Sequence, residues 1–247
     1  MKTLIGFLLL LCLPVSGLAQ GVDVNPRFLI DMPIASTLPR ASFDITLRVF
    51  PNGGTLTTID VGLHERLMFG VSFGGINVIG GGDIQWQPFA GANFRYRLLS
   101  ETFTLPALLV GFDSQGHGAY NDEVRRFERK SLGFFAVASK NYEVMDHLSF
   151  HVGTNYSLET ADGDKSPNLF TGIDFGITPE LAIVGEYDFA LNDNSDNSLG
   201  SGKGYLNLGI RYNIKNVVYF EFYFIDLLRN KYGNFQRAVK LTYFEFF

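Results

Sequence analysis

Cysteine and long apolar runs are both scarce in this sequence, and each scarcity excludes a class of protein. Cys12 is the only cysteine and lies in an apolar N-terminal stretch, so the rest of the chain holds neither a thiol nor a disulfide. After residue 19, no apolar run approaches the ~20 residues that a membrane-spanning helix needs. A helical membrane protein is therefore excluded.

Charge is also sparse and nearly balanced, since 20 basic and 25 acidic residues give a formal net charge of −5. A mildly acidic chain lacks the basic surface that binds nucleic acid, so we expect no nucleic-acid partner. What the chain has in quantity is Phe (24), Tyr (11) and Gly (27), a composition that favours lipid-facing β-strands.

Residues 1–19 have the pattern of a secretory signal peptide. Lys2 supplies the positive charge, residues 4–13 form the apolar core, and Gly17 and Ala19 are the small residues before the expected cleavage site. The alternative, a retained anchor helix, is disfavoured because the apolar run is well short of a membrane span. We therefore predict export, a periplasmic or luminal segment over residues 20–40, and one barrel domain over residues 41–247.

From residue 42 onward, apolar and polar side chains alternate with a period of two, which indicates β-strands with one apolar face. In residues 42–50, for example, Ile45 and Leu47 alternate with Asp44 and Arg48. The clear segments are 42–50, 56–63, 67–73, 92–98, 148–158, 206–212 and 218–224. The less regular segments are 103–113, 131–141, 168–177, 181–191 and 238–246, and in the first two of these the phase is ambiguous. The pattern predicts an all-β fold, a transmembrane antiparallel up-and-down β-barrel of about 12 strands.

The connections between these segments alternate between short and long. The short turns are 64–66, 100–102, 142–146, 178–180 and 213–216. The long loops are 74–87, 114–130, 159–167, 192–203 and 227–237, whereas the first connection, 51–54, is short and breaks the trend. In outer-membrane barrels the tight turns face the periplasm and the long loops face outside, so the chain has the expected polarity.

The C-terminal strand has the alternating pattern of a barrel-assembly signal. Val239, Leu241, Tyr243 and Phe247 stand at positions −9, −7, −5 and −1 from the end, whereas Glu245 occupies position −3, where an aromatic residue is more usual. We therefore expect the cell outer membrane as the location, with outer-membrane lipid and the barrel-assembly machinery as partners.

A soluble β-sandwich or small soluble barrel is the simplest alternative to a membrane barrel. Its inward face would be apolar, but here the polar face carries full charges that a soluble core cannot hold without a large desolvation cost. The expected inward-facing charges are Arg48, Asp60, Arg95, Arg97, Asp174, Glu186, Asp188, Arg211 and Glu221, with Asp44 and Lys240 beside them. The apolar face must then meet lipid.

These charges of both signs allow two interpretations of the predicted lumen. One is a pore lining that selects a polar solute, and the other is a network of ion pairs that fills the barrel and holds it shut. Eight strands give a packed interior and sixteen or more give an aqueous channel, so twelve leave both interpretations open.

Three weaker patterns point to other chemistry. Ser149, His151 and Asn155 are the residue types of a lipid hydrolase, as in the outer-membrane phospholipase barrel, but the alternation places them inside, away from lipid. The acidic loops around 162–164 and 193–197 lack the glycine and terminal glutamate of a calcium loop, which favours a solvated loop. The glycine-rich stretch 74–82 does not join a strand to a helix, so it is no phosphate loop, but it is a candidate constriction folded into the lumen.

Several stretches between residues 30 and 140 resemble the YjbH-type outer-membrane proteins associated with exopolysaccharide production. They are Met32-Pro-Ile-Ala-Ser-Thr, Leu67-Met-Phe-Gly-Val-Ser, Gly80 to Pro88, Tyr96-Arg-Leu-Leu, Pro106-Ala-Leu-Leu-Val-Gly-Phe-Asp and Ala136-Val-Ala-Ser-Lys. Members of that family are usually longer, so this chain resembles a short, barrel-only relative. The resemblance implies a role in polysaccharide production, with polysaccharide or other export components as partners, and no catalytic residues.

We expect a non-enzymatic outer-membrane barrel without cofactor or metal, acting as a passive channel or as an accessory factor in export of a polar polymer. A closed barrel whose long loops dock partners is the second hypothesis. A lipid-acting enzyme is the third, and it depends on His151.

Overall fold

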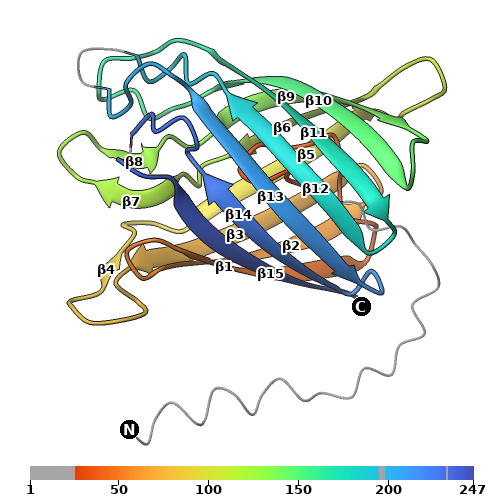
Figure 1. Cartoon of the computed structure of the whole chain (residues 1–247), viewed down its shortest axis with the longest axis horizontal. Helices are drawn as coiled ribbons and strands as arrows, with labels where there is room; N and C mark the ends of the chain where they lie inside the picture. The colour runs from red at the N-terminus through yellow and green to blue at the C-terminus, as the bar shows by residue number, and fades with distance from the viewer. Residues whose placement is uncertain (1–25, 195–197, 232) are drawn as a thin grey trace, which may run out of the picture.

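The computed structural model describes residues 26–194, 198–231 and 233–247, which form a closed β-barrel (Figure 1). The barrel strands are β1 (Ser42–Phe50), β2 (Gly54–His64), β3 (Leu67–Ile76), β5 (Gly91–Leu99), β6 (Ala107–Asp113), β9 (Gly133–Tyr142), β10 (His147–Tyr156), β11 (Asn168–Thr178), β12 (Leu181–Asp188), β13 (Tyr205–Ile214), β14 (Val218–Ile225) and β15 (Gln236–Phe246). These twelve antiparallel strands confirm the predicted fold class. Within the described residues, no helix is long and apolar enough to cross a membrane.

The first and last strands close the barrel. β1 pairs with β15 over eight residue pairs, from Ser42 opposite Phe246 to Val49 opposite Val239, and all other neighbours are consecutive barrel strands. The register shifts lie in the β2–β3, β5–β6 and β11–β12 pairs, each next to a short turn. Closure removes both sheet edges, so the backbone hydrogen bonds of a membrane-spanning sheet are satisfied.

The connections have the predicted polarity. Short turns lie at the end that carries the C-terminus, and longer connections lie at the opposite end, which we call the loop end (Figure 1). The glycine-rich connection between β3 and β5 carries the short strand β4 (Gln85–Trp86) and is largely exposed. It projects from the barrel, so its predicted role as a constriction is wrong.

The outward face of the barrel is apolar. Ile45, Leu47, Phe69 and Phe94 are each between 41% and 44% exposed, and they alternate with buried, inward-facing residues. This arrangement is the reverse of that in a soluble barrel, because the exposed surface is the one that lipid covers.

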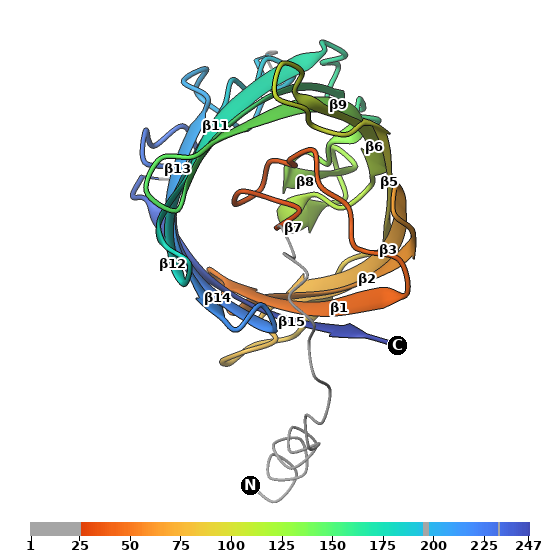
Figure 2. The same cartoon turned by 90° about the vertical axis from the view of Figure 1, so that its right-hand side faces the viewer.

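Residues 26–38, which we call the plug, lie inside the barrel (Figure 2). One side packs through Met32 and Ala35 against inward apolar residues of β6, β9 and β11. The other side packs through Leu29, Ile30 and Ile34 against β12, β14 and β15. The apolar core is therefore luminal, and it explains the ambiguous phase of residues 103–113 and 131–141, whose inward residues include Leu109, Phe135 and Val137.

The connection between β6 and β9 enters the lumen from the loop end. It forms a hairpin of β7 (His117–Asn121) and β8 (Arg126–Arg129), whose turn is exposed while Phe127 and Arg129 are buried. Seen along the barrel, the hairpin and the plug occupy the same interior (Figure 2). The lumen is thus filled from both ends by segments of the chain itself.

Candidate functional site

Charged groups of the wall hold the backbone of the plug. The Glu186 carboxylate of β12 accepts from the backbone N–H groups of Ile30, Asp31 and Met32 at 2.9–3.1 Å. On β13, the Arg211 guanidinium donates to the carbonyls of Phe28 and Leu29 at 3.0 and 3.1 Å. The plug has no partner strand for most of its backbone, so these side chains satisfy groups whose burial would otherwise be costly.

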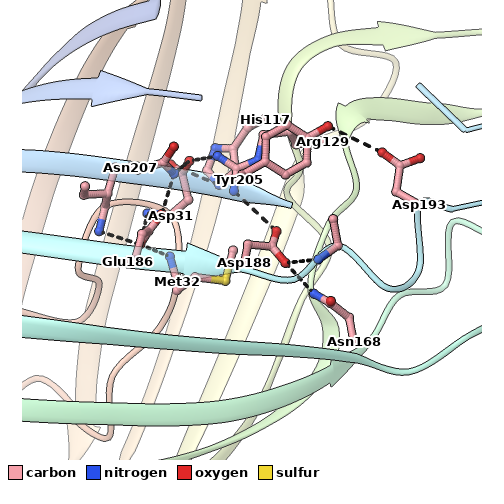
Figure 3. Close-up of polar contacts among 12 residues, drawn as sticks. Asp31, Met32, His117, Arg129, Asn168, Glu186, Asp188, Asp193, Tyr205 and Asn207 are labelled. Carbon is pink, nitrogen blue, oxygen red and sulfur yellow. Dashed lines mark hydrogen bonds and ion pairs between the residues drawn. The ribbon is translucent and has the colours of Figure 1, made fainter. Parts of the chain in front are cut away.

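Asp31 of the plug lies at the junction of four other elements (Figure 3). Its carboxylate accepts from Arg48 of β1 and from Arg129 of β8, lies 3.6 Å from His117 of β7, and accepts from Asn207 of β13 at 3.4 Å. The carboxylate is fully buried. One side chain therefore ties the plug to the wall and to the hairpin from the loop end.

Burial and the charges around Asp31 also determine the protonation state of His117 beside it. The pKa of His117 is lowered from 6.5 to about 3, mainly by burial and also by the cations Arg48, Arg129 and Lys240, against the opposing effect of Asp31. His117 is thus neutral at physiological pH. The arginines alone supply the positive charge that Asp31 balances.

A second cluster lies nearer the short-turn end. Arg211 donates from Nε to Glu221 at 2.7 Å and from Nη1 to Asp174 at 2.5 Å. Lys240 pairs with Glu221 at 2.7 Å, and His147 lies 3.1 Å from Asp174. The predicted inward charges of β11, β13, β14 and β15 therefore meet as one network across neighbouring strands.

A third cluster joins the start of the plug to β1, β2 and β5. Arg27 pairs with Asp44 and lies 3.7 Å from Asp60, and Arg95 donates to the Arg27 carbonyl at 2.6 Å. The Arg95 guanidinium lies 4.2 Å from the ring centroid of Phe28, a cation–π distance. Like Glu186 and Asp188, Arg95 serves to hold the interior segments rather than to line open space.

The predicted solvated loops contain a buried charge cluster instead. Arg126 donates to Asp162 at 2.7 Å and to Asp193 at 2.6 Å, Lys130 pairs with Asp162, and all four side chains are buried. Arginine and lysine thus occupy the position where the calcium alternative needed a cation. In the described part of the chain, no group of three or more His, Cys, Asp and Glu residues is arranged to hold a metal.

Backbone donors add to this network at the loop end. Glu159 accepts from the backbone N–H groups of Phe127 and Ser131 at 3.1 and 2.7 Å, although burial still raises its pKa above the usual range. Buried ion pairs and hydrogen bonds therefore join the hairpin to the described parts of the β10–β11 and β12–β13 connections.

Three cavities follow one another along the barrel beside the plug. The outer one, about 290 Å³, lies between the hairpin and the β1–β2 and β4 connections, and the inner one at the short-turn end is about 430 Å³. Between them lies a middle cavity of about 90 Å³. Arg48, Asp31 and His117 line both the outer and the middle cavities, whereas Arg211 and Tyr219 line both the middle and the inner ones. Successive cavities are therefore adjacent, since they share lining side chains.

The structure divides the nine predicted lumen charges by position. Arg48, Asp60, Arg97, Asp174, Arg211 and Glu221 line this series of cavities. Arg97 differs from the others in being only half-buried, near the short-turn end, where it donates to Thr37 of the plug. Glu186, Asp188 and Arg95 instead contact the plug or the hairpin. The lumen thus holds both a packed interior and polar cavities lined by charge.

The remaining predicted residues take ordinary positions. His151 and Ser149 face the inner cavity, and His151 Nδ1 lies 2.8 Å from Ser139 Oγ. Val239, Leu241 and Tyr243 lie on β15 and Phe247 follows it, donating its backbone N–H to the Ala41 carbonyl at 2.9 Å. The predicted signal residues Gly17 and Ala19 lie outside the described residues.

Sequence reasoning missed Asp31, Arg129 and Asn207, which form the junction with Arg48. Asp31 and Arg129 lie outside the alternating segments, so the period-two pattern assigned them no face. Asn207 was on the predicted inward face of its strand but carries no charge. A charged residue within the otherwise apolar stretch 28–35 was the one available signal.

Comparison with known proteins identifies no family for this chain. No family model and no curated protein matches the chain. Among solved structures, it is similar to the KdgM porin, with 13% identity over 82% of this chain and 98% of that one and a TM-score of 0.49. It is also similar to the NanC porin, with 7% identity over 83% of this chain and 99% of that one and a TM-score of 0.46. No functional assignment follows from similarities this distant.

Proposed function

We propose that this protein is a passive outer-membrane channel for small polar solutes, with a narrow conduit beside an internal plug. The observation that carries the proposal is the series of three cavities between the loop end and the short-turn end, lined by charges of both signs. A structure stabilised only by its packed interior has no need of polar cavities placed in series along the barrel.

The size of the cavities limits which solutes pass while the plug is in the lumen. The middle cavity of about 90 Å³ has room for several water molecules, since holding one needs at least roughly 10–15 Å³ on such a measure. Water and small ions therefore fit, and Arg211 and Glu221 offer hydrogen bonds to a hydroxyl group. A polymer passes only when the plug leaves the lumen.

The finer part of the proposal is a role in exopolysaccharide production or export. It is supported by the resemblance of residues 30–140 to YjbH-type proteins, one stretch of which, Met32-Pro-Ile-Ala-Ser-Thr, lies within the plug. Polysaccharide or other export components are the proposed partners, and the proposed route to the outer membrane is the signal peptide followed by the barrel-assembly machinery.

Planar-bilayer recording tests the channel directly. Purified protein is expected to give small, stepwise conductance in KCl, which soluble polysaccharide added on the loop side reduces if a polymer enters the outer cavity. Silent bilayers at high protein load, with the barrel shown to be folded by its heat-dependent gel mobility, would exclude the channel. Conductance that polysaccharide leaves unchanged would exclude only the polysaccharide role.

A closed docking barrel is the second candidate, and the buried loop-end cluster of Arg126, Asp162 and Asp193 favours it. A rigid loop end presents a fixed surface to a partner without any transport. This candidate predicts no conductance from the wild-type protein.

We propose that the protein is not an enzyme. His151 is 4% exposed and faces the inner cavity, so it is remote from the lipid surface where a lipid hydrolase works. Lipase activity in detergent extracts that disappears with His151→Ala would contradict this proposal.

A further inference from the structure

Asp31 lies where the outer and the middle cavities meet, at the level where the conduit changes from about 290 Å³ to about 90 Å³. Its partners come from both sides of the junction. Arg48 belongs to the wall, whereas Arg129 and His117 belong to the hairpin. A solute that crosses from one cavity to the other must pass this group of side chains.

Among the described residues, Asp31 is the carboxylate that lines both the outer and the middle cavities. Asp31 and Arg48 are the charged residues that line both cavities, and Arg129 lines the outer one. Other carboxylates line only one of the two cavities, such as Glu128 in the outer one and Glu221 in the middle one. Glu186 and Asp188 line neither and are engaged by the plug backbone, Asn207, Asn168 and Arg129. Without the Asp31 charge, Arg48 and Arg129 lose their shared counter-ion, and Arg129 keeps Asp188 at 3.5 Å.

We propose that Asp31 is the selectivity residue of the conduit, and that its bonds to Arg48 and Arg129 hold the plug across the junction. This inference rests on the proposed channel function and adds a residue-level cause for its ion preference and its narrowness. With Asp31 in place, the positive charge at the junction is partly balanced and the plug is anchored to the hairpin. With the carboxylate removed, the junction becomes more positive and the plug loses its ion pairs with Arg48 of β1 and Arg129 of β8.

The test measures reversal potentials under a KCl gradient in planar bilayers. Asp31→Asn is expected to lower the K⁺/Cl⁻ permeability ratio by at least about fivefold, the factor for one elementary charge acting at about 4 Å in a water-like dielectric. Its conductance is also expected to exceed that of the wild type. Asp31→Glu, which keeps the charge, is expected to retain the wild-type ion preference.

Two further variants separate selectivity from a merely structural effect. Arg48→Gln removes the positive group that lines the same two cavities, so it is expected to shift the ratio in the opposite direction. Asp162→Asn is the matched control, because Asp162 is a buried partner of an arginine and a lysine but lines none of the three cavities. It is expected to leave the ratio unchanged.

The outcomes distinguish this inference from the proposed function. Conducting Asp31→Asn channels with the wild-type reversal potential would overturn the role of Asp31 and leave the channel intact. A shift of Asp31→Asn and Arg48→Gln in the same direction would also overturn it. Silence of every variant, including one that lacks the plug, would overturn the channel and the inference with it.

Discussion

Replacement of Arg211 by methionine is expected to destabilise the barrel strongly. The guanidinium makes four hydrogen bonds, to Glu221, Asp174 and the carbonyls of Phe28 and Leu29. Methionine is similar in length and fills the space, so packing changes little and the loss is mainly polar. The variant leaves two carboxylates of the wall and two carbonyls of the plug without this donor.

The expected magnitude follows from the partners that remain. Removing one member of a buried ion pair costs about 3–5 kcal/mol because the other charge is stranded. Here Glu221 keeps Lys240 at 2.7 Å and Asp174 keeps His147 at 3.1 Å. We therefore expect a loss near the lower end, about 3 kcal/mol.

Urea titration of the protein refolded in lipid vesicles measures the free energy of unfolding, with gel mobility reporting the folded barrel. Arg237→Met, at an exposed arginine, is the matched control and is expected to stay within about 0.5 kcal/mol of the wild type. Combining Arg211→Met with Asp174→Asn removes one stranded charge, so the double variant is expected to lose about 1–3 kcal/mol less than the sum of the single losses. A loss below about 1 kcal/mol for Arg211→Met, or strict additivity in the double variant, would refute the reasoning.

Two other predictions concern the plug and its junction. A Cβ atom at Gly172 would lie 2.1 Å from Leu29 Cδ1 of the plug and 2.8 Å from the Gly185 carbonyl, so Gly172→Val is expected to displace the plug and raise conductance. The control is Gly185→Val, whose side chain meets Ile173 and Leu208 on the outer face. Equal conductance of the two variants would contradict the prediction. Because burial lowers the pKa of His117 from 6.5 to about 3, the unfolded chain binds its proton first on acidification, and stability is lost as the pH falls from about 6.5 towards 3. The imidazole is 24% exposed and faces Asp31, Arg48, Arg129 and Lys240, so we expect the free energy of unfolding to fall by only about 1 kcal/mol between pH 7 and pH 4.5. His117→Gln is expected to remove this fall. Identical urea–pH profiles of the wild type and the variant would disprove the prediction.

The strands were predictable because their cause is local. Each barrel strand must alternate between lipid and lumen, so period two is imposed on the sequence itself, as in residues 42–50, whose predicted bounds match β1. The ends at which the short turns and the long loops lie followed from the lengths of the connections alone. Where the alternation was unclear, in β6 and β9, the cause was not local: their inward residues Leu109, Phe135 and Val137 face the apolar side of the plug.

The interior was less predictable because its partners are distant in sequence. The sequence allowed either a pore or a packed lumen, and the structure shows a lumen packed by a segment that ends before the first strand, with polar cavities beside it. Asp31 and Glu186 are 155 residues apart and Asp31 and Arg129 are 98 apart, so no spacing rule relates them. The acidic loop residues Asp162 and Asp193 had the composition of solvated loops, and only the position of Arg126 shows that they are buried partners.

Single-channel conductance of the folded barrel with and without residues 26–38 is the most direct test of the central claim, that the plug restricts a conduit through this barrel. The plug fills the interior beside a middle cavity of only about 90 Å³, so the variant without it is expected to conduct in steps several times larger than those of the wild type. Equal step sizes from two barrels of the same folded gel mobility would contradict the claim.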